Sequence, residues 1–267
     1  MGSRFVTRFD APAFHDALAT TAIGRFMVYR ETVDTTMVLA RREADEGAPH
    51  GTLVLAEEQT AGRGRKGRSF QSPPGENLYF TFVLRCPVEQ HRRLPVAVPL
   101  AVVAAVQAEG VDAAIKWPND IWAGDRKLCG MLIDAELTAA GAIALPGIGI
   151  NVNGDPARIP ELRDIATSLE RELGRRVHRE ALLARICNEL EAALLLGPAE
   201  LARRYRERSL VIGRRVRVTP LAGEPYEALA MSIGNDGSLV VERDDGKLED
   251  LNAAEVTLRP AVPASRR

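Results

Sequence analysis

The stretch KLCGMLIDAELTAAGAIALPGIGIN, residues 127–151, decides the fold of the chain. Two apolar runs, residues 127–137 and 142–151, flank the short segment Thr138-Ala139-Ala140-Gly141. Apolar runs separated by a few small residues are typical of a β-hairpin. We therefore predict two antiparallel strands here, with Gly130 at a point of close backbone approach.

Strands and helices are predicted on both sides of this hairpin. Apolar, β-branched or aromatic segments predict strands at residues 26–30, 51–56, 78–84 and 113–117. Capping residues and helical periodicity predict helices at residues 11–19, 36–46, 94–109, 178–195 and 199–208. A loop rich in glycine, arginine, serine and proline spans residues 58–77, and loops of this length are usually functional.

The pattern changes near Gly213. From there to residue 258, short apolar segments alternate with the turn signals Asn235-Asp236-Gly237 and Asp244-Asp245-Gly246. Four or five short strands of this kind predict a small all-β module. We therefore expect three parts, namely residues 1–212, residues 213–260 and a tail at residues 261–267.

Composition excludes several classes of protein. The 267 residues include 35 basic and 36 acidic side chains, a formal net charge of -1, which does not favour binding to nucleic acid or to a membrane surface. The cysteines, Cys86, Cys129 and Cys187, are odd in number and lack metal-ligand spacing. We therefore expect no disulfide framework, no zinc site and a reducing, cytoplasmic setting. The apolar segments predict neither a signal peptide nor a membrane span.

A glycine- and arginine-rich segment, QTAGRGRKGR at residues 59–68, carries the strongest functional signal. Glycines let a backbone approach a ligand and expose its N–H groups. Guanidinium groups bind carboxylate and phosphate oxygens in pairs. The segment therefore suits a site that brings two anions together, although a solvated basic turn has the same composition.

Two further segments place lysines next to turns. In Lys116-Trp117-Pro118-Asn119-Asp120, a strand delivers a cation, and the proline then enforces a turn that presents an amide and a carboxylate. Lysine suits a phosphate, and aspartate suits magnesium, which prefers carboxylate and phosphate oxygens. In RKLCGML, residues 126–132, Lys127 begins an apolar strand and can neutralise a reacting carboxylate and phosphate. Ordinary hairpin corners would also explain both segments.

The last segment, GIGINVN at residues 147–153, ends the second strand of the hairpin. Its glycines leave space for a ring against the strand, and Asn151 can donate and accept hydrogen bonds at the strand end. A glycine in a strand also marks a simple bulge. Cys129 has no activating base nearby in the sequence, so we expect a packed side chain rather than a nucleophile.

Together the four segments resemble the biotin protein ligase family. The resemblance is carried by G-R-G-R-x-G-R at residues 62–68, K-W-P-N-D at residues 116–120, K-L-x-G-x-L at residues 127–132 and G-x-G-I-N at residues 147–151. They follow the order and similar spacing of the family, from about residue 25 to residue 258. Each segment alone is weak, but the joint pattern is highly specific.

The resemblance implies an α+β fold, in which a mixed-sheet, class II synthetase-like catalytic domain precedes a small SH3-like β-barrel. It implies that the carboxylate of biotin attacks the α-phosphate of ATP, with magnesium present and pyrophosphate released. A lysine of a biotin carboxyl carrier domain, from acetyl-CoA carboxylase or a similar enzyme, then attacks the adenylate and releases AMP. The loop at residues 62–72 would close over the adenylate and exclude water. The implied enzyme is a cytoplasmic monomer or homodimer.

The family's biotin contacts can be carried over residue by residue. Thr35 and Thr36 match a hydroxyl pair that meets the ureido ring, and Gln59 matches a glutamine beside the bicycle. Lys127 matches the lysine that bonds the biotin carboxylate. The implied biotin-binding set is Thr35, Thr36, Gln59, Gly62, Arg63, Gly64, Arg65, Lys127 and Gly130.

The nucleotide contacts and the catalytic groups follow in the same way. Phe70 stands where the family often has tryptophan and would shield the adenine, and Asn151 matches an asparagine near the adenosine. The implied adenylate-binding set is Arg65, Arg68, Phe70, Lys116, Asn119 and Asn151. The implied catalytic set is Lys127, Arg65, Lys116 and Asp120, with Asp120 also the magnesium ligand.

One departure from the family concerns biotin directly. The family usually has Ser-Thr-Asn where this chain has Thr35-Thr36-Met37. Threonine keeps the hydroxyl, but Met37 removes an amide and with it one polar contact.

Three other functions were weighed against this one. Lipoate and octanoate ligases share the core fold but usually carry an Arg-Arg-x-x-Gly-Gly-Gly segment and a nearby histidine, which this sequence lacks. A biotin-sensing repressor would need a helix-turn-helix module, and the segment before residue 26 is too short for one. A protein that only holds biotinyl-AMP would not need Lys116, Asp120 and Lys127 together.

Overall fold

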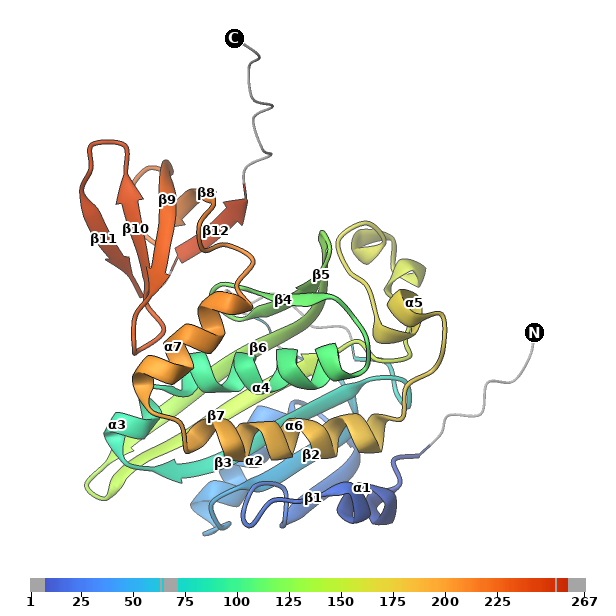
Figure 1. Ribbon diagram of the computed structural model, residues 1–267. Helices are drawn as coiled ribbons and strands as arrows, with labels where there is room; N and C mark the ends of the chain where they lie inside the picture. The colour runs from blue at the N-terminus through green and yellow to red at the C-terminus, as the bar shows by residue number, and fades with distance from the viewer. Residues whose placement is uncertain (1–7, 63, 65–71, 253, 259–267) are drawn as a thin grey trace.

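The computed structural model describes residues 8–62, 64, 72–252 and 254–258 (Figure 1). In these ranges, one mixed sheet has the strand order β1-β2-β3-β7-β6-β5-β4. Its strands are β1 (Met27–Val33), β2 (Thr52–Gln59), β3 (Leu78–Cys86), β4 (Ala113–Lys116), β5 (Asp120–Ala123), β6 (Arg126–Thr138) and β7 (Gly141–Ile150). Strands β1 and β2 are parallel, and the other neighbouring pairs are antiparallel. The mixed sheet confirms the predicted α+β class.

The predicted hairpin forms the centre of this sheet. Strands β6 and β7 pair from Cys129 and Ile150 at one end to Thr138 and Gly141 at the other. Gly141 has φ of 138°, and a Cβ there would lie 2.6 Å from the carbonyl oxygen of Cys86. A glycine is therefore needed where the hairpin turn passes the end of β3.

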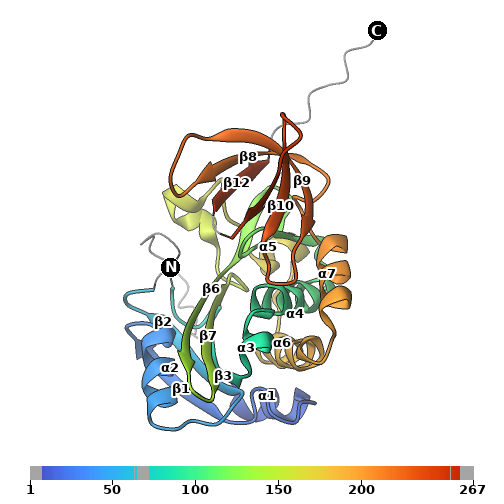
Figure 2. The same cartoon turned by 90° about the vertical axis from the view of Figure 1, so that its left-hand side faces the viewer.

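Helices cover both faces of the sheet. Figure 2 shows α2 (Thr36–Asp45) on one side and α4 (Leu94–Ala108) and α6 (Arg179–Leu194) on the other. Thr35 caps α2, because its hydroxyl accepts the N–H of Met37 at 3.0 Å. The remaining helical segments are α1 (Ala11–Ala17), α3 (Val88–His91), α5 (Leu169–Leu173), α7 (Pro198–Glu207), and the 3-10 turns η2 (Pro156–Arg158) and η3 (Pro160–Leu162).

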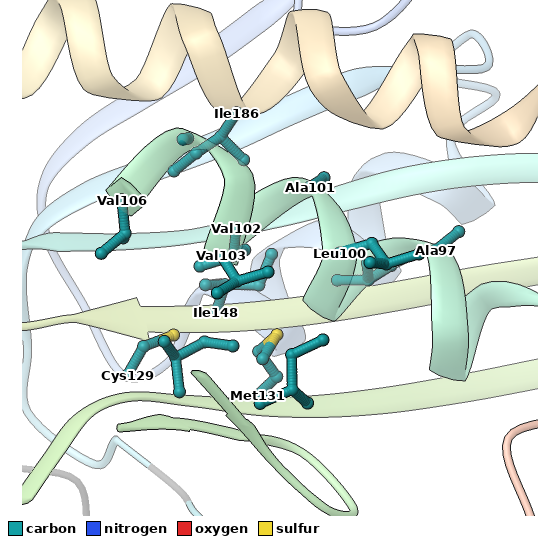
Figure 3. Packing of buried hydrophobic residues seen from close by; sticks show 14 of the residues in the cluster. Ala97, Leu100, Ala101, Val102, Val103, Val106, Cys129, Met131, Ile148 and Ile186 are labelled. Atoms are coloured by element: carbon teal, nitrogen blue, oxygen red, sulfur yellow. The ribbon is translucent and has the colours of Figure 1, made fainter. Parts of the chain in front are cut away.

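The main hydrophobic core lies between the sheet and α4. This helix is apolar on nearly all sides because α6 covers the part that the sheet does not. Figure 3 shows Leu100 and Val103 of α4 beside Met131 and Ile148 of the hairpin. Cys129 lies in the same layer, where burial raises the pKa of its thiol, so its packed role agrees with the prediction.

A second, antiparallel sheet follows, with the order β11-β10-β9-β8-β12. Its strands are β8 (Arg215–Pro220), β9 (Tyr226–Ile233), β10 (Leu239–Arg243), β11 (Leu248–Leu251) and β12 (Ala254–Leu258). The chain reaches this sheet along the edge of the first one, because Leu210 N donates to the carbonyl of Ile115 on β4 at 2.7 Å. The indole N–H of Trp117 also donates to the carbonyl of Gly237, at 2.8 Å, in the turn before β10.

Some elements differ from the prediction. The short strand β5 and the helices α3 and α5 were not predicted, since each spans only four or five residues. Strand β2 continues to Gln59, whereas the prediction ended the strand at residue 56 and began a loop at residue 58. Glu57 is tolerated in the strand because Arg179 pairs with it in the interior. None of the helices within the described ranges combines the length and hydropathy that a bilayer-spanning segment needs.

Candidate active site

The strand register brings several candidate residues onto one face of the sheet. Lys116 pairs with Asp120, Asp120 with Gly130, and Gly130 with Gly149, across four neighbouring strands. Directly paired residues point to the same face of a sheet. In the next row, Gly147 pairs with Thr81 on β3. These residues lie on the side of the sheet that carries α2, while their neighbours along the strands point to the side of α4.

A cluster of charges stands at one end of this face. The ammonium of Lys127 lies 2.7 Å from a carboxylate oxygen of Asp120, and both side chains are partly exposed. The ammonium of Lys116 lies 3.9 Å from the ring centroid of Trp122. The backbone N–H of Lys127 donates to Ile165 O, and its carbonyl accepts from Thr167 N, at 2.9 Å each. A partly exposed pair of cations on a fixed backbone suits the binding of an anionic ligand.

Gly130 provides the space for the ammonium of Lys127. A Cβ on Gly130 would lie 2.9 Å from Lys127 Nζ and 3.7 Å from Asp120 Oδ1. The glycine is therefore needed for the position of this lysine rather than for an unusual backbone angle.

Replacing Gly130 by alanine should displace Lys127 while leaving the fold intact, because only the flexible end of a side chain has to move. We expect the rate of substrate activation to fall about tenfold or more, since a shift of about 1 Å in a catalytic group has large effects. Gly197→Ala is the matched control, because a Cβ there meets nothing within 4 Å. Initial rates and melting temperatures of both variants check this, and equal rates would contradict the role given to Gly130.

A network of uncharged polar groups stands at the other end of the face. The carbonyl oxygen of the Gln59 side chain accepts from Thr36 N at 2.9 Å and from Thr36 Oγ1 at 3.2 Å. Thr81 Oγ1 donates to Thr36 Oγ1 at 2.9 Å, and Gln59 Nε2 donates to Ser72 Oγ at 3.1 Å. The network fixes which way the Gln59 amide points, so its donor and acceptor are oriented before a ligand binds.

Met37 packs against Gly147 of β7, between the charged cluster and the Thr36–Gln59 network. A Cβ on Gly147 would lie 2.8 Å from Met37 Cγ and 2.9 Å from its sulfur. Met37 also lines a groove of about 520 Å³ between α2 and β6. The groove is lined by Thr35, Met37, Val38, Arg41, Arg42, Leu132, Ile133 and Asp134. The residue that departs from the family pattern therefore forms an apolar wall next to Thr35.

The structure engages both candidate asparagines in bonds within the protein. Asn119 Nδ2 donates to the carbonyl of Met131, and Met131 N donates to Asn119 O at 3.0 Å, which fastens the turn before β5 to β6. Asn151 Nδ2 donates to Thr167 O at 3.0 Å, and its backbone N–H donates to Leu128 O at 3.0 Å. Asn151 therefore stands beside the strand that carries Lys127.

The glycine- and arginine-rich segment is described only in part. Arg63, Arg65, Arg68 and Phe70 lie outside the described residues. Gly62 is buried and Gly64 is half-buried. The segment leaves β2 next to the N-terminus of α2, since Ala61 N donates to Asp34 O at 2.9 Å. Its first residues therefore start beside Thr35 and Thr36.

Thr81 and Trp122 also contact the candidate residues and were not predicted from the sequence. Thr81 is the one threonine in the largely apolar strand LYFTFVLRC, and a buried polar side chain in such a strand needs a partner. That signal was available in the sequence. The contact of Trp122 with Lys116 depends on the pairing of β4 with β5, which the sequence did not predict.

The described residues offer a divalent metal few ligands. Within them, no group of three or more histidine, cysteine, aspartate or glutamate side chains could hold a metal ion. Asp120 supplies one carboxylate next to Lys127. Magnesium typically uses one or two carboxylates and takes its other oxygens from phosphates and water. Asp120 therefore fits a magnesium ion that arrives with a polyphosphate.

Comparisons with known proteins identify the family. Residues 29–153 match the Biotin/lipoate A/B protein ligase family, and residues 211–259 match the Biotin protein ligase C terminal domain. The chain is 33% identical over 251 residues to the bifunctional ligase/repressor BirA of Bacillus subtilis, covering 90% of this chain and 76% of that protein. The chain belongs to the biotin protein ligase family. The biotin--[acetyl-CoA-carboxylase] ligase of Mycobacterium tuberculosis is also 33% identical, over 80% of this chain and 82% of that protein.

Solved structures of family members have the same fold. The biotin protein ligase from Aquifex aeolicus in complex with biotin and ATP matches with a TM-score of 0.72 and 26% identity, over 88% of this chain and 99% of that one. The Leishmania major enzyme in complex with biotinyl-5-AMP matches with a TM-score of 0.61 and 27% identity, over 86% and 99%. The family's mixed sheet and its C-terminal β-module are therefore both present, and the latter is consistent with an SH3-like barrel.

Proposed function

We propose that this chain is a biotin–protein ligase. It converts biotin and ATP to biotinyl-5'-AMP and then transfers biotin to a lysine of a biotin carboxyl carrier domain. One observation carries the proposal: a single sheet face has Lys127, Lys116 and Asp120 at one end and the Thr36–Gln59 network at the other. Biotin has a polar ring system, an apolar chain and an acid group. These parts match the Thr36–Gln59 network, the apolar surface of Met37 and the lysines, in that order.

The proposed first step joins two anions. A carboxylate oxygen of biotin attacks the α-phosphorus of ATP, the new C–O–P bond forms, and the bond to the β-phosphate oxygen breaks with release of pyrophosphate. Lys127 leaves Asp120 and bonds the carboxylate and the α-phosphate, while Lys116 offsets charge on the phosphates. These cations lower the repulsion between the reactants at the moment when the bond forms.

The second step consumes the adenylate. The uncharged amine of the carrier lysine attacks the acyl carbon, the amide bond forms, and AMP leaves with the bonding electron pair while the amine loses a proton. Exclusion of water protects the mixed anhydride until the carrier arrives. The segment with Gly62, Arg63, Gly64, Arg65, Arg68 and Phe70 is proposed to close over the adenylate.

The remaining site residues take roles that follow their positions. Thr35, Thr36 and Gln59 bind the ureido ring, Gly130 leaves space at the biotin carboxylate, and Asn119 and Asn151 lie toward the nucleotide. Asp120 would hold magnesium together with the phosphates, and the ion would supply further neutralisation of phosphate charge. The proposed domain division is residues 1–212, 213–260 and a tail at 261–267. We expect a cytoplasmic enzyme, a monomer or homodimer, without affinity for nucleic acid.

The test is a two-stage assay. The protein is incubated with ATP, magnesium and labelled biotin, and pyrophosphate and bound adenylate are measured; the carrier domain of acetyl-CoA carboxylase is then added. We expect a bound adenylate in the first stage and labelled carrier in the second. Activation of lipoate or octanoate in preference to biotin would contradict the proposal, and so would an adenylate that never reaches the carrier.

A further inference from the structure

Two of the three residues that follow Asn151, Val152 and Gly154, donate their backbone N–H groups to one buried side chain, that of Asn77. Its Oδ1 accepts from Val152 N at 2.9 Å and from Gly154 N at 3.1 Å. The backbone adds a bond, from Asn153 N to Glu76 O at 2.8 Å. The stretch that follows β7 is therefore hydrogen-bonded to residues 76 and 77, directly before β3.

Asn77 is fixed as firmly as the loop that it holds. It is 4% exposed, and its Nδ2 donates to the hydroxyl of Tyr79 at 2.9 Å. Tyr79 in turn donates to Pro73 O at 3.1 Å. The Oδ1 of Asn77 accepts the N–H groups of Val152 and Gly154, and its Nδ2 donates to Tyr79. These bonds fix the carboxamide in a single orientation.

Gly154 makes this close contact possible. A Cβ on Gly154 would lie 2.7 Å from Asn77 Nδ2 and 2.9 Å from Asn77 Oδ1. Because Asn77 is buried and bonded on every side, it cannot move aside as an exposed side chain would. Loop and carboxamide are therefore complementary in shape as well as in hydrogen bonding.

The same network reaches the biotin end of the site. Arg179 Nη1 donates to the carbonyl of Asn77 at 3.0 Å and to a carboxylate oxygen of Glu57 at 2.7 Å. Glu57 lies on β2 two residues before Gln59. One buried network thus attaches to the strand of Gln59 on one side and to the loop of Asn151 on the other.

We propose that Asn77 is the positioning residue for the nucleotide side of the active site. It acts through the loop: by holding Val152 and Gly154 it keeps Asn151 next to the strand of Lys127, on the side proposed for the adenosine. The inference rests on the proposed function and adds a residue to it. Loss of the carboxamide leaves the N–H groups of Val152 and Gly154 without an acceptor and loosens the loop at these two residues, while Asn153 keeps its bonds to Glu76 and Val177. The Thr36–Gln59 network stays in place.

The test compares affinities for the two substrates. In Asn77→Ala, KM for ATP and the Kd for AMP, measured by calorimetry, should rise about tenfold, while the Kd for biotin without nucleotide changes less than about threefold. Asn77→Asp keeps an acceptor for both N–H groups and should restore most of the ATP affinity. Thr52→Ala is the matched control, because it removes a buried hydroxyl bond, to Pro49 O at 2.8 Å, at the far end of β2.

Several results would overturn the inference. Equal losses of biotin and AMP affinity in Asn77→Ala would show that Asn77 has a purely structural role. Unchanged AMP affinity in the folded variant would show that Asn77 has no role in nucleotide binding. If Asn77→Ala does not fold, Gly154→Ala forces the loop away from the carboxamide instead, because the added Cβ would lie 2.7 Å from Asn77 Nδ2. This variant should show the same selective loss of AMP affinity, and an AMP affinity equal to that of the wild type would contradict the proposal. A wild-type protein that binds AMP but forms no biotinyl adenylate would refute the proposed function and not this inference.

Discussion

Replacing Lys127 by alanine should lower the rate of biotinyl-adenylate formation at least about tenfold, because one charged hydrogen bond contributes about 1.5–3 kcal/mol. The ammonium of Lys127 lies 2.7 Å from Asp120 without substrate, at the charged end of the sheet face. In the variant, Asp120 keeps its negative charge and faces the incoming carboxylate and phosphate. Repulsion then adds to the loss of the cation.

The measurement is pyrophosphate release at saturating ATP and biotin. Lys247→Ala is the control, since Lys247 is exposed in the turn before β11. Lys127→Arg keeps the charge but not the shape of the ammonium, and should recover only part of the rate. An unchanged rate in Lys127→Ala would mean that this lysine does not meet the reacting groups.

Replacing Arg179 by methionine should lower the free energy of unfolding by about 3–5 kcal/mol, the usual cost of removing one partner of a buried ion pair. Arg179 binds both carboxylate oxygens of Glu57, at 2.7 and 3.2 Å, and the two side chains are 5% and 6% exposed. Phe9 N and the Tyr29 hydroxyl donate to the same carboxylate, at 2.7 and 3.0 Å. Without Arg179, a buried negative charge would remain with only neutral donors.

This loss should depend on pH. In the wild type, burial raises the pKa of Glu57, but the hydrogen bonds and charge of Arg179, together with the hydrogen bonds from Phe9 and Tyr29, hold this pKa below its ordinary value. A carboxyl with a depressed pKa contributes stability above its unfolded pKa of about 4.3 and loses it as pH falls through the folded value. In Arg179→Met the pKa of Glu57 should instead rise above its ordinary value. Protonation of Glu57 at lower pH then removes the buried charge and restores part of the variant's stability. The two stabilities should therefore converge as the pH falls from about 7 toward about 4.

Urea denaturation at several pH values checks both statements. Arg203→Met is the matched control, because Arg203 pairs with Glu200 and Glu207 on the surface of α7 and its loss should leave stability nearly unchanged. An Arg179→Met variant as stable as the control at neutral pH would contradict the buried pair. A difference that stays constant down to acid pH would show that Glu57 is not the group involved.

Much of the fold could be predicted because the signals are local. Two apolar runs around a short segment of small residues predicted the central hairpin, and the capping residues at 34–36 predicted the start of α2. Short elements escaped because four or five residues carry too little pattern, as in β5 and α5. Glu57 escaped for another reason: its partner Arg179 is 122 residues away, and nothing near Glu57 in the sequence announces a buried strand position.

The family could be predicted from four short motifs, because each motif combines glycines, lysines or arginines within a few neighbouring residues. The sequence by itself also determined the class of fold, because periodicity is a property of neighbouring residues. Only the tertiary structure decided that Lys116, Asp120 and Gly130 form one row, that Gly130 leaves space for Lys127, and that Asn77 carries the loop after Asn151. Strand register and buried hydrogen bonds join residues far apart in the chain, and a one-residue change in register would turn each strand's side chains to the opposite face.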